Sequence, residues 1–285
     1  MRYREARVRA ASELKDLEDP LLEAELLLRH VTGWSRHVLL MRLDSEIPPD
    51  RLSEYLELVD RRRKREPLQH LTGTVDFMGL EFHCGPGALV PRPETETLAW
   101  LFSEGLGNPS LIADVGTGSG VLAVTLALRF PECLIVGSDI SIEALALASR
   151  NRLRHRAENL QLVAGDLLEP FISGRAVFDG MVANLPYVPS GEIQGLQPEV
   201  SKGDPRIALD GGPDGLRLVE RLLDSAGSLL AGGGFLALEL GTEQTGPVRD
   251  GMAAAGLWED VSIEDDLTGR PRFVTARRIS LRPLS

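Results

Sequence analysis

The stretch DVGTGSG at residues 114–120 decides the fold of this chain. Its first three residues are the end of the apolar run LIADVG, which is typical of a buried strand. The stretch is followed by VLAVTLALRF, which is typical of a buried helix. Glycines let the backbone turn sharply and approach a ligand closely, and the first turn of a helix offers free N–H groups. Strand, loop and helix together predict the first unit of a ligand-binding α/β sheet.

Strands and helices continue to alternate after this unit. Residues 134–140, 160–165, 178–184 and 233–241 have the apolar content of strands, and residues 141–154, with Ser141 as N-cap, and 216–230 have helical periodicity. Repeated β-α units imply a parallel sheet with right-handed crossovers. The last two strands, 261–266 and 272–278, are joined too tightly for a helix crossover, so we expect an antiparallel hairpin at one edge of the sheet.

Residues 1–72 have a different pattern, which predicts a small helical bundle. One helix is expected from Pro20 to a stop at Gly33, and a second from about Pro49 into the basic cluster 61–65. Residues 73–91 predict a linking β-hairpin around Phe77 and Phe82, and a further helix is expected to start near Pro93. The expected domains are therefore 1–72, a substrate-recognition bundle, and 73–285, the α/β domain.

Composition narrows the possible partners. The net charge is −11, and residues 1–70 are formally neutral, so the rest of the chain carries the whole charge. An acidic chain is a poor generic binder of nucleic acid, because attraction to phosphates supplies most non-specific affinity. Cys84 and Cys133 form no CxxC pair, so we expect no metal site and a reducing compartment. With neither a signal peptide nor an apolar run of membrane-spanning length, we expect a cytoplasmic protein.

The glycine loop and three side chains at strand ends predict a nucleoside site. A dinucleotide fold prefers GxGxxG, whereas GxGxG preceded by Asp114 suits a ligand with an amino-acid tail. Asp139 ends the second strand and can accept both hydroxyls of a ribose. Asp166 and Leu167 follow the third strand and can flank an adenine.

The fourth strand runs into Asn184-Leu185-Pro186-Tyr187, which resembles the (Asn/Asp)-Pro-Pro-(Tyr/Phe) motif of methyltransferases that act on planar nitrogens. The lone pair of such a nitrogen is delocalised, so the nitrogen is a weak nucleophile. The side-chain oxygen of Asn184 and the carbonyl of Leu185 can accept its hydrogens and align it with the methyl donor, which makes positioning the main catalytic contribution. Tyr187 can pack on the flat face of the substrate. Leu185 replaces the first proline of the usual motif.

These residues lie in a chain that resembles the PrmC/HemK family of peptide-chain-release-factor glutamine methyltransferases along nearly its whole length. The resemblance includes the N-terminal helices, the hairpin, VPRPETE at 90–96, DVGTGSG, SDIS at 138–141, ANLPYV at 183–188 and ALDGGPDGL at 208–216. The PRPETE string is the most diagnostic, because it resembles the release-factor enzymes rather than the related ribosomal-protein glutamine methyltransferases.

The resemblance implies a Rossmann-like class I methyltransferase that transfers a methyl group from S-adenosylmethionine to the glutamine amide of the Gly-Gly-Gln loop of bacterial-type release factors, leaving S-adenosylhomocysteine. With the residue-level interpretation above, the cofactor-binding residues would be Gly116, Thr117, Gly118, Ser119, Gly120, Asp139, Asp166, Leu167 and Asn184. The substrate residues would be Arg92, Glu94 and Asn184 to Tyr187, and the catalytic ones Asn184, Pro186 and Tyr187. The chain is expected to act as a monomer without direct contact to nucleic acid or membrane.

Two other functions share parts of this pattern. An N6-adenine methyltransferase would use the same Asn-x-Pro-Tyr chemistry, but it would be expected to carry a basic groove and aromatic residues for a flipped base. A non-catalytic S-adenosylmethionine-binding module would have no need of Asn184 and Tyr187. The basic cluster 61–65 would suit either an acidic release factor or an ordinary solvated helix end.

Overall fold

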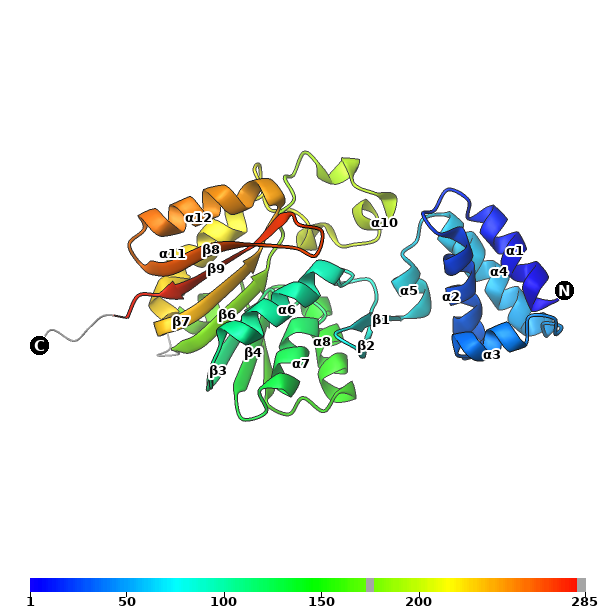
Figure 1. Cartoon of the computed structure of the whole chain (residues 1–285), viewed down its shortest axis with the longest axis horizontal. Coiled ribbons are helices and arrows are strands. Elements are labelled where there is room, and N and C mark those ends of the chain that lie inside the picture. The colour runs from blue at the N-terminus through cyan, green and yellow to red at the C-terminus, as the bar shows by residue number, and fades with distance from the viewer. Residues whose placement is uncertain (173–176, 281–285) are drawn as a thin grey trace, which may run out of the picture. The chain divides into compact units, whose positions relative to one another are not determined.

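The computed structural model describes residues 1–172 and 177–280, which form two compact units (Figure 1). One unit comprises Met1–Thr74 together with Gln197–Gly203, and the other comprises Val75–Leu196 and the chain from Asp204 onward. Residues 197–203 thus belong with the N-terminal helices, although more than a hundred residues separate them in the sequence.

The first unit is built from helices. Its helices are α1 (Tyr3–Glu13), α2 (Pro20–Thr32), α3 (Arg36–Met41), α4 (Pro49–Arg63), α5 (Leu68–Thr72) and α10 (Pro198–Ser201). The Asp19 carboxylate caps α2 by accepting from the Leu22 amide, and Gly33 ends the helix with φ +68°, so both predicted ends are confirmed. Buried Tyr3, Leu27 and Tyr55 belong to one apolar core that α1, α2 and α4 share.

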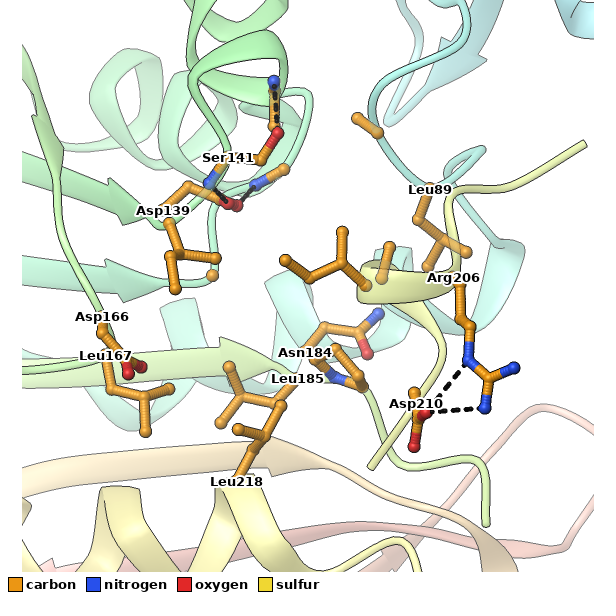
Figure 2. A pocket seen from close by; sticks show the side chains of 18 of the residues that line it. Leu89, Asp139, Ser141, Asp166, Leu167, Asn184, Leu185, Arg206, Asp210 and Leu218 are labelled. Atoms are coloured by element: carbon orange, nitrogen blue, oxygen red, sulfur yellow. Dashed lines mark hydrogen bonds and ion pairs between the residues drawn. The ribbon is translucent and has the colours of Figure 1, made fainter. Parts of the chain in front are cut away.

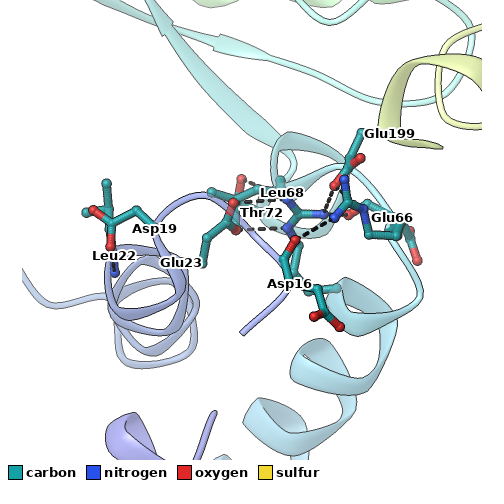
Figure 3. Close-up of polar contacts among 10 residues, drawn as sticks. Asp16, Asp19, Leu22, Glu23, Glu66, Leu68, Thr72 and Glu199 are labelled. Atoms are coloured by element: carbon teal, nitrogen blue, oxygen red, sulfur yellow. Dashed lines mark hydrogen bonds and ion pairs between the residues drawn. The ribbon is translucent and has the colours of Figure 1, made fainter. Parts of the chain in front are cut away.

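The basic cluster at residues 61–65 is neutralised within this unit. Arg62 is buried and donates to Glu23 at 2.8 and 2.9 Å and to Glu199 of α10 at 2.9 Å. Figure 3 labels both of these glutamates. Arg65 also pairs with Glu199, and the other three cations of the cluster pair with Asp60 or Glu66. The cluster is therefore an internal ion-pair network, and α10 is attached to the bundle through it.

The second unit is built on a seven-stranded sheet in the order β5-β4-β3-β6-β7-β9-β8. The strands are β3 (Leu111–Val115), β4 (Leu134–Asp139), β5 (Leu160–Ala164), β6 (Phe178–Asn184), β7 (Leu230–Glu239), β8 (Trp258–Asp265) and β9 (Pro271–Arg278). The strands from β5 to β7 are parallel, and β9 pairs antiparallel with both β7 and β8. The predicted parallel sheet with an antiparallel edge hairpin is confirmed, as is a separate hairpin of β1 (Thr74–Phe77) and β2 (Leu80–His83).

Helices cover both faces of the sheet (Figure 1). They are α6 (Pro93–Gly105), α7 (Val121–Arg129), α8 (Ile142–Arg154), α9 (Glu169–Ile172), α11 (Arg217–Leu229) and α12 (Thr245–Ala254), with short 3₁₀ turns at Ile193–Gly195, Arg206–Ala208 and Thr242–Gln244. Alternate strand residues such as Val182 and Met181 belong to two separate cores, one shared with α6 and α7 and the other with α11 and α12. No helix within the described residues has both the length and the apolar content that a membrane span requires.

The parallel strands bring their carboxyl ends to one edge of the sheet. Val115 at the end of β3 is in register with Ser138, and Asn184 at the end of β6 is in register with Glu239 at the end of β7. Ligands of open α/β sheets bind outside this edge. The fold therefore collects the strand-end residues from separate parts of the sequence in one place.

Candidate active site

A cavity of about 500 Å³ lies at this edge of the sheet (Figure 2). Its lining includes eight of the residues predicted for the site, namely Gly116, Gly118, Asp139, Asp166, Leu167, Asn184, Leu185 and Pro186. The other predicted residues do not line it, namely Thr117, Ser119, Gly120, Tyr187, Arg92 and Glu94. Among the described residues, His, Cys, Asp and Glu side chains form no group suited to hold a metal ion.

The glycine loop has a backbone conformation that other residues rarely adopt. Gly116, Gly118 and Gly120 have φ values of +75°, +56° and +80°. A Cβ atom on Gly120 would lie 2.9 Å from the Cβ of Ala148 on α8, so this glycine also permits close packing of α7 and α8. The loop is shaped for a ligand that approaches its backbone.

Thr117 and Ser119 do not line the cavity, but they hold the glycine loop in place through hydrogen bonds. The Thr117 hydroxyl donates to the Asp114 carboxylate at 2.6 Å, and the Ser119 carbonyl accepts from the Asn151 side chain at 2.8 Å. Both serine and threonine are buried. Burial also raises the pKa of the Asp114 carboxyl to about 7.

Asp139 joins the glycine loop to α8. One carboxylate oxygen accepts the Gly118 amide at 2.8 Å, and the other accepts the Ser141 amide at 2.8 Å. A carboxylate has about four acceptor positions, so each oxygen retains capacity toward the cavity. Burial raises the pKa of Asp139 above its ordinary value, while the amides oppose that shift.

Asp166 and Leu167 enter the cavity from the loop after β5 (Figure 2). Leu167 has φ +49°, an unusual value for a residue with a side chain, and its carbonyl accepts the Ser138 hydroxyl at 3.3 Å. Asp166 pairs with Arg221 of α11 at 2.9 Å. The second Asp166 oxygen accepts no hydrogen bond from the described residues and lies next to the apolar Leu167, an arrangement suited to an adenine amino group and ring.

Asn184 has one end of its amide fixed by neighbouring side chains. Its Nδ2 donates to the Thr95 hydroxyl at 2.9 Å, and that hydroxyl donates to Glu239 at 2.9 Å. Its Oδ1 makes no hydrogen bond with the described residues. Burial raises the pKa of Glu239, whereas the Arg272 guanidinium, 3.1 Å away, favours the ionised form.

Tyr187 does not line the cavity, and its side chain is held by Arg272. The Arg272 guanidinium donates to its hydroxyl and lies 4.6 Å from the centroid of its ring. Its backbone carbonyl accepts from Gln244 at 2.8 Å. Burial raises the pKa of the Tyr187 hydroxyl. Packing on a substrate's flat face remains a prediction for this residue.

Arg92 acts on a neighbouring segment. It pairs with the fully buried carboxylate of Asp204 at 2.6 Å, and the other oxygen of Asp204 accepts the Val90 amide at 2.9 Å. Asp204 precedes the turn Arg206–Ala208, which lines the cavity. The resemblance-based role of Arg92 near the substrate glutamine therefore stays a prediction, and the observed contact fixes the cavity wall.

Several contributors were not identified from the sequence. Thr95 and Glu239 contact Asn184 or its partner, Arg272 links Glu239 to Tyr187, and Arg206, Asp210, Arg217 and Arg221 line the cavity. Thr95 lies inside PRPETE, Asp210 inside ALDGG and Glu239 at the end of the fifth strand. No such pattern singles out Arg221 or Arg272.

Curated relatives match the chain over most of its length. The "Release factor glutamine methyltransferase" of Moorella thermoacetica is 40% identical over 92% of this chain and 93% of its own. The protein of the same name from Geobacter sulfurreducens is 39% identical over 92% and 91%. The chain belongs to the release factor glutamine methyltransferase family.

Family models and a solved structure agree with that membership. A model described as "PrmC N-terminal domain" matches residues 5–73, and one described as "Methyltransferase small domain" matches residues 95–196. The crystal structure of a methyltransferase from Pyrococcus furiosus has the same fold, with a TM-score of 0.53 and 18% identity over 81% of this chain and 99% of that one. The predicted class I methyltransferase fold and family are confirmed.

Proposed function

We propose that this release factor glutamine methyltransferase transfers a methyl group from S-adenosylmethionine to the N5 side-chain amide nitrogen of the glutamine in the Gly-Gly-Gln motif of release factors. The observation that carries the proposal is the Asn184 amide, which lines the cavity and has its oxygen unpaired among the described residues. A glutamine amide nitrogen needs this type of acceptor, because both of its hydrogens are polar and its lone pair is delocalised.

The cavity residues fit S-adenosylmethionine. The glycine loop offers close backbone approach to the amino-acid tail, and the remaining acceptor capacity of Asp139 matches the two hydroxyls of a ribose. Asp166 and Leu167 match the amino edge and the face of an adenine. When bound, the cofactor supplies an electrophilic methyl group on a sulfonium and leaves as S-adenosylhomocysteine.

The residues of the NLPY segment act mainly by positioning. Asn184 Oδ1 accepts one hydrogen of the substrate amide, and the carbonyl of Leu185 accepts the other, which directs the nitrogen lone pair away from both acceptors. Pro186 limits the backbone freedom of this segment. The amide nitrogen gains the methyl group and releases one proton to solvent water, so the product is a neutral N-methyl amide.

We also propose a binding partner, an oligomeric state and a cellular location for the enzyme. The helical unit contributes to recognition of the release factor, and the enzyme acts as a monomer in the cytoplasm. An N6-adenine methyltransferase is the competing function, and the net charge of −11 disfavours it because a nucleic-acid substrate requires basic contacts. The cations of the 61–65 cluster are paired with carboxylates of the chain, so they do not make a nucleic-acid substrate more favourable.

Methyl transfer to a purified bacterial release factor tests the proposal. After incubation with S-adenosylmethionine, mass spectrometry of the peptide with the Gly-Gly-Gln motif should show one added methyl group on the glutamine. Asn184→Ala should lower the rate of this gain by about 100- to 1,000-fold, and Asn108→Ala, at an exposed asparagine, should leave it unchanged. Methylation of adenine in added RNA or DNA, with none on the release factor, would show that the chain is an N6-adenine methyltransferase instead.

A further inference from the structure

The side chain of Asn184 can serve as an acceptor only if its amide is turned with the oxygen toward the substrate. Asparagine can turn its amide by half a rotation and present NH₂ instead, and an NH₂ group would repel the hydrogens of a substrate amide. Asn184 and Glu239 are in register on neighbouring strands, and Thr95 of α6 bridges their side chains. The orientation therefore depends on how hydrogens are distributed along this bridge.

The hydrogens can be assigned from the charged end of the bridge. Arg272 has donors only and stays protonated, and it donates to one oxygen of Glu239 at 3.1 Å. Glu239 has a fully buried side chain, and although burial raises its pKa, the Arg272 guanidinium at ion-pair distance favours the carboxylate, which only accepts hydrogen bonds.

The single hydrogen of the Thr95 hydroxyl must then go to the second oxygen of Glu239, 2.9 Å away. The hydroxyl has only lone pairs left for Asn184, also 2.9 Å away, so the Asn184 group facing it must be NH₂. The amide oxygen is thereby turned to the opposite side, and Asn184 lines the cavity.

We propose that Thr95 and Glu239 are positioning residues that fix the Asn184 amide with its oxygen toward the substrate nitrogen. The proposal rests on the proposed function for the identity of the substrate. Glu239 also connects the two ends of the NLPY segment, because Arg272 donates to both Glu239 and the Tyr187 hydroxyl. A buried carboxylate destabilises the folded state unless it is paired. In this arrangement the paired Glu239 carboxylate also orients Asn184.

Substitutions at Thr95 separate orientation from folding. Thr95→Val keeps the shape but removes the hydroxyl, so we expect kcat to fall by about 10- to 100-fold while the Kd for S-adenosylmethionine changes by less than about threefold. Thr95→Ser restores the hydroxyl and should recover kcat to within about threefold of wild type. Thr97→Val, the same substitution two residues along α6, serves as the matched control and should behave as wild type.

A double-mutant cycle distinguishes positioning from a general structural role. Thr95→Val should have no further effect in an Asn184→Ala background, because its effect acts through Asn184. Glu239→Gln tests the other end of the bridge: its amide can donate to Thr95, which frees the threonine hydrogen for Asn184 and allows the wrong orientation, so kcat should fall. A Thr95→Val enzyme with wild-type kcat, or an equal further loss in the Asn184→Ala background, would overturn the proposal.

The side-chain NH₂ signal of Asn184 in ¹H–¹⁵N spectra gives a readout independent of the substrate. It should shift in Thr95→Val and Glu239→Gln and stay in place in Thr97→Val. If wild-type protein methylates no release factor, the proposed function fails and this signal still decides the orientation. An unchanged signal in Thr95→Val would overturn the positioning role even in an active enzyme.

Discussion

Replacing Asp139 by alanine tests the assignment of the cofactor site most directly. The Asp139 carboxylate accepts the amides of Gly118 and Ser141, one on each oxygen, both at 2.8 Å. Each oxygen retains one acceptor position for a ribose hydroxyl. The substitution should therefore weaken the binding of S-adenosylmethionine by the loss of two hydrogen bonds to a charged acceptor.

The expected size of the effect follows from those two bonds. A hydrogen bond to a charged group contributes about 1.5 kcal/mol at the low end, so the pair contributes about 3 kcal/mol, or a roughly 150-fold increase in Kd. Isothermal titration calorimetry with S-adenosylmethionine measures this directly. Because binding is measured without a release factor, the result does not depend on the identity of the substrate.

Asp179→Ala is a matched control for the structural part of the change. Asp179 also accepts two backbone amides, those of Ser110 at 2.6 Å and Leu111 at 3.0 Å, but it does not line the cavity. Its replacement should leave the Kd unchanged. A folded Asp139→Ala protein whose Kd stays within about fivefold of wild type would refute the ribose assignment.

Three further substitutions test the packing and electrostatics of the chain by urea unfolding. Gly215→Ala should destabilise the protein by about 2 kcal/mol or more and lower methyl transfer, because Gly215 has φ +80° and an added Cβ would collide with the Tyr187 carbonyl; wild-type stability would contradict this. Arg62→Met should cost about 3 kcal/mol because it removes the cation that pairs with the partly buried Glu23 and leaves Glu199 with Arg65 alone, whereas Arg63→Met, at an exposed pair, should cost less than about 1 kcal/mol; equal costs would count against the network. Burial raises the pKa of Asp114 to about 7, so the folded chain retains a proton that the unfolded chain releases above about pH 4. The free energy of unfolding should therefore fall as pH rises from about 4 to about 7. Asp114→Asn should flatten this pH dependence, and an unchanged slope would show that Asp114 does not cause it.

The order of strands and helices followed from local sequence patterns. Runs such as LIVGSDI and FDGMVAN predicted β4 and β6 because buried parallel strands are continuously apolar. Helix α12 was missed, because its sequence TGPVRDGMAA contains two glycines and a proline, which lower helix propensity. Burial of Val248 and Met252 against the sheet stabilises that helix, and such burial is a tertiary effect.

Local sequence patterns predict the sheet, the glycine loop and the NLPY segment, because these depend on neighbouring residues or on repeats along the chain. Which side chains meet across the fold is a property of the three-dimensional packing. Thr95 lies 89 residues from Asn184 and 144 from Glu239, and no local pattern indicates contacts at such separations. The same holds for the ion pair between Arg62 and Glu199. Folding places these groups at hydrogen-bonding distance, and their few donors and acceptors then decide which way the Asn184 amide faces.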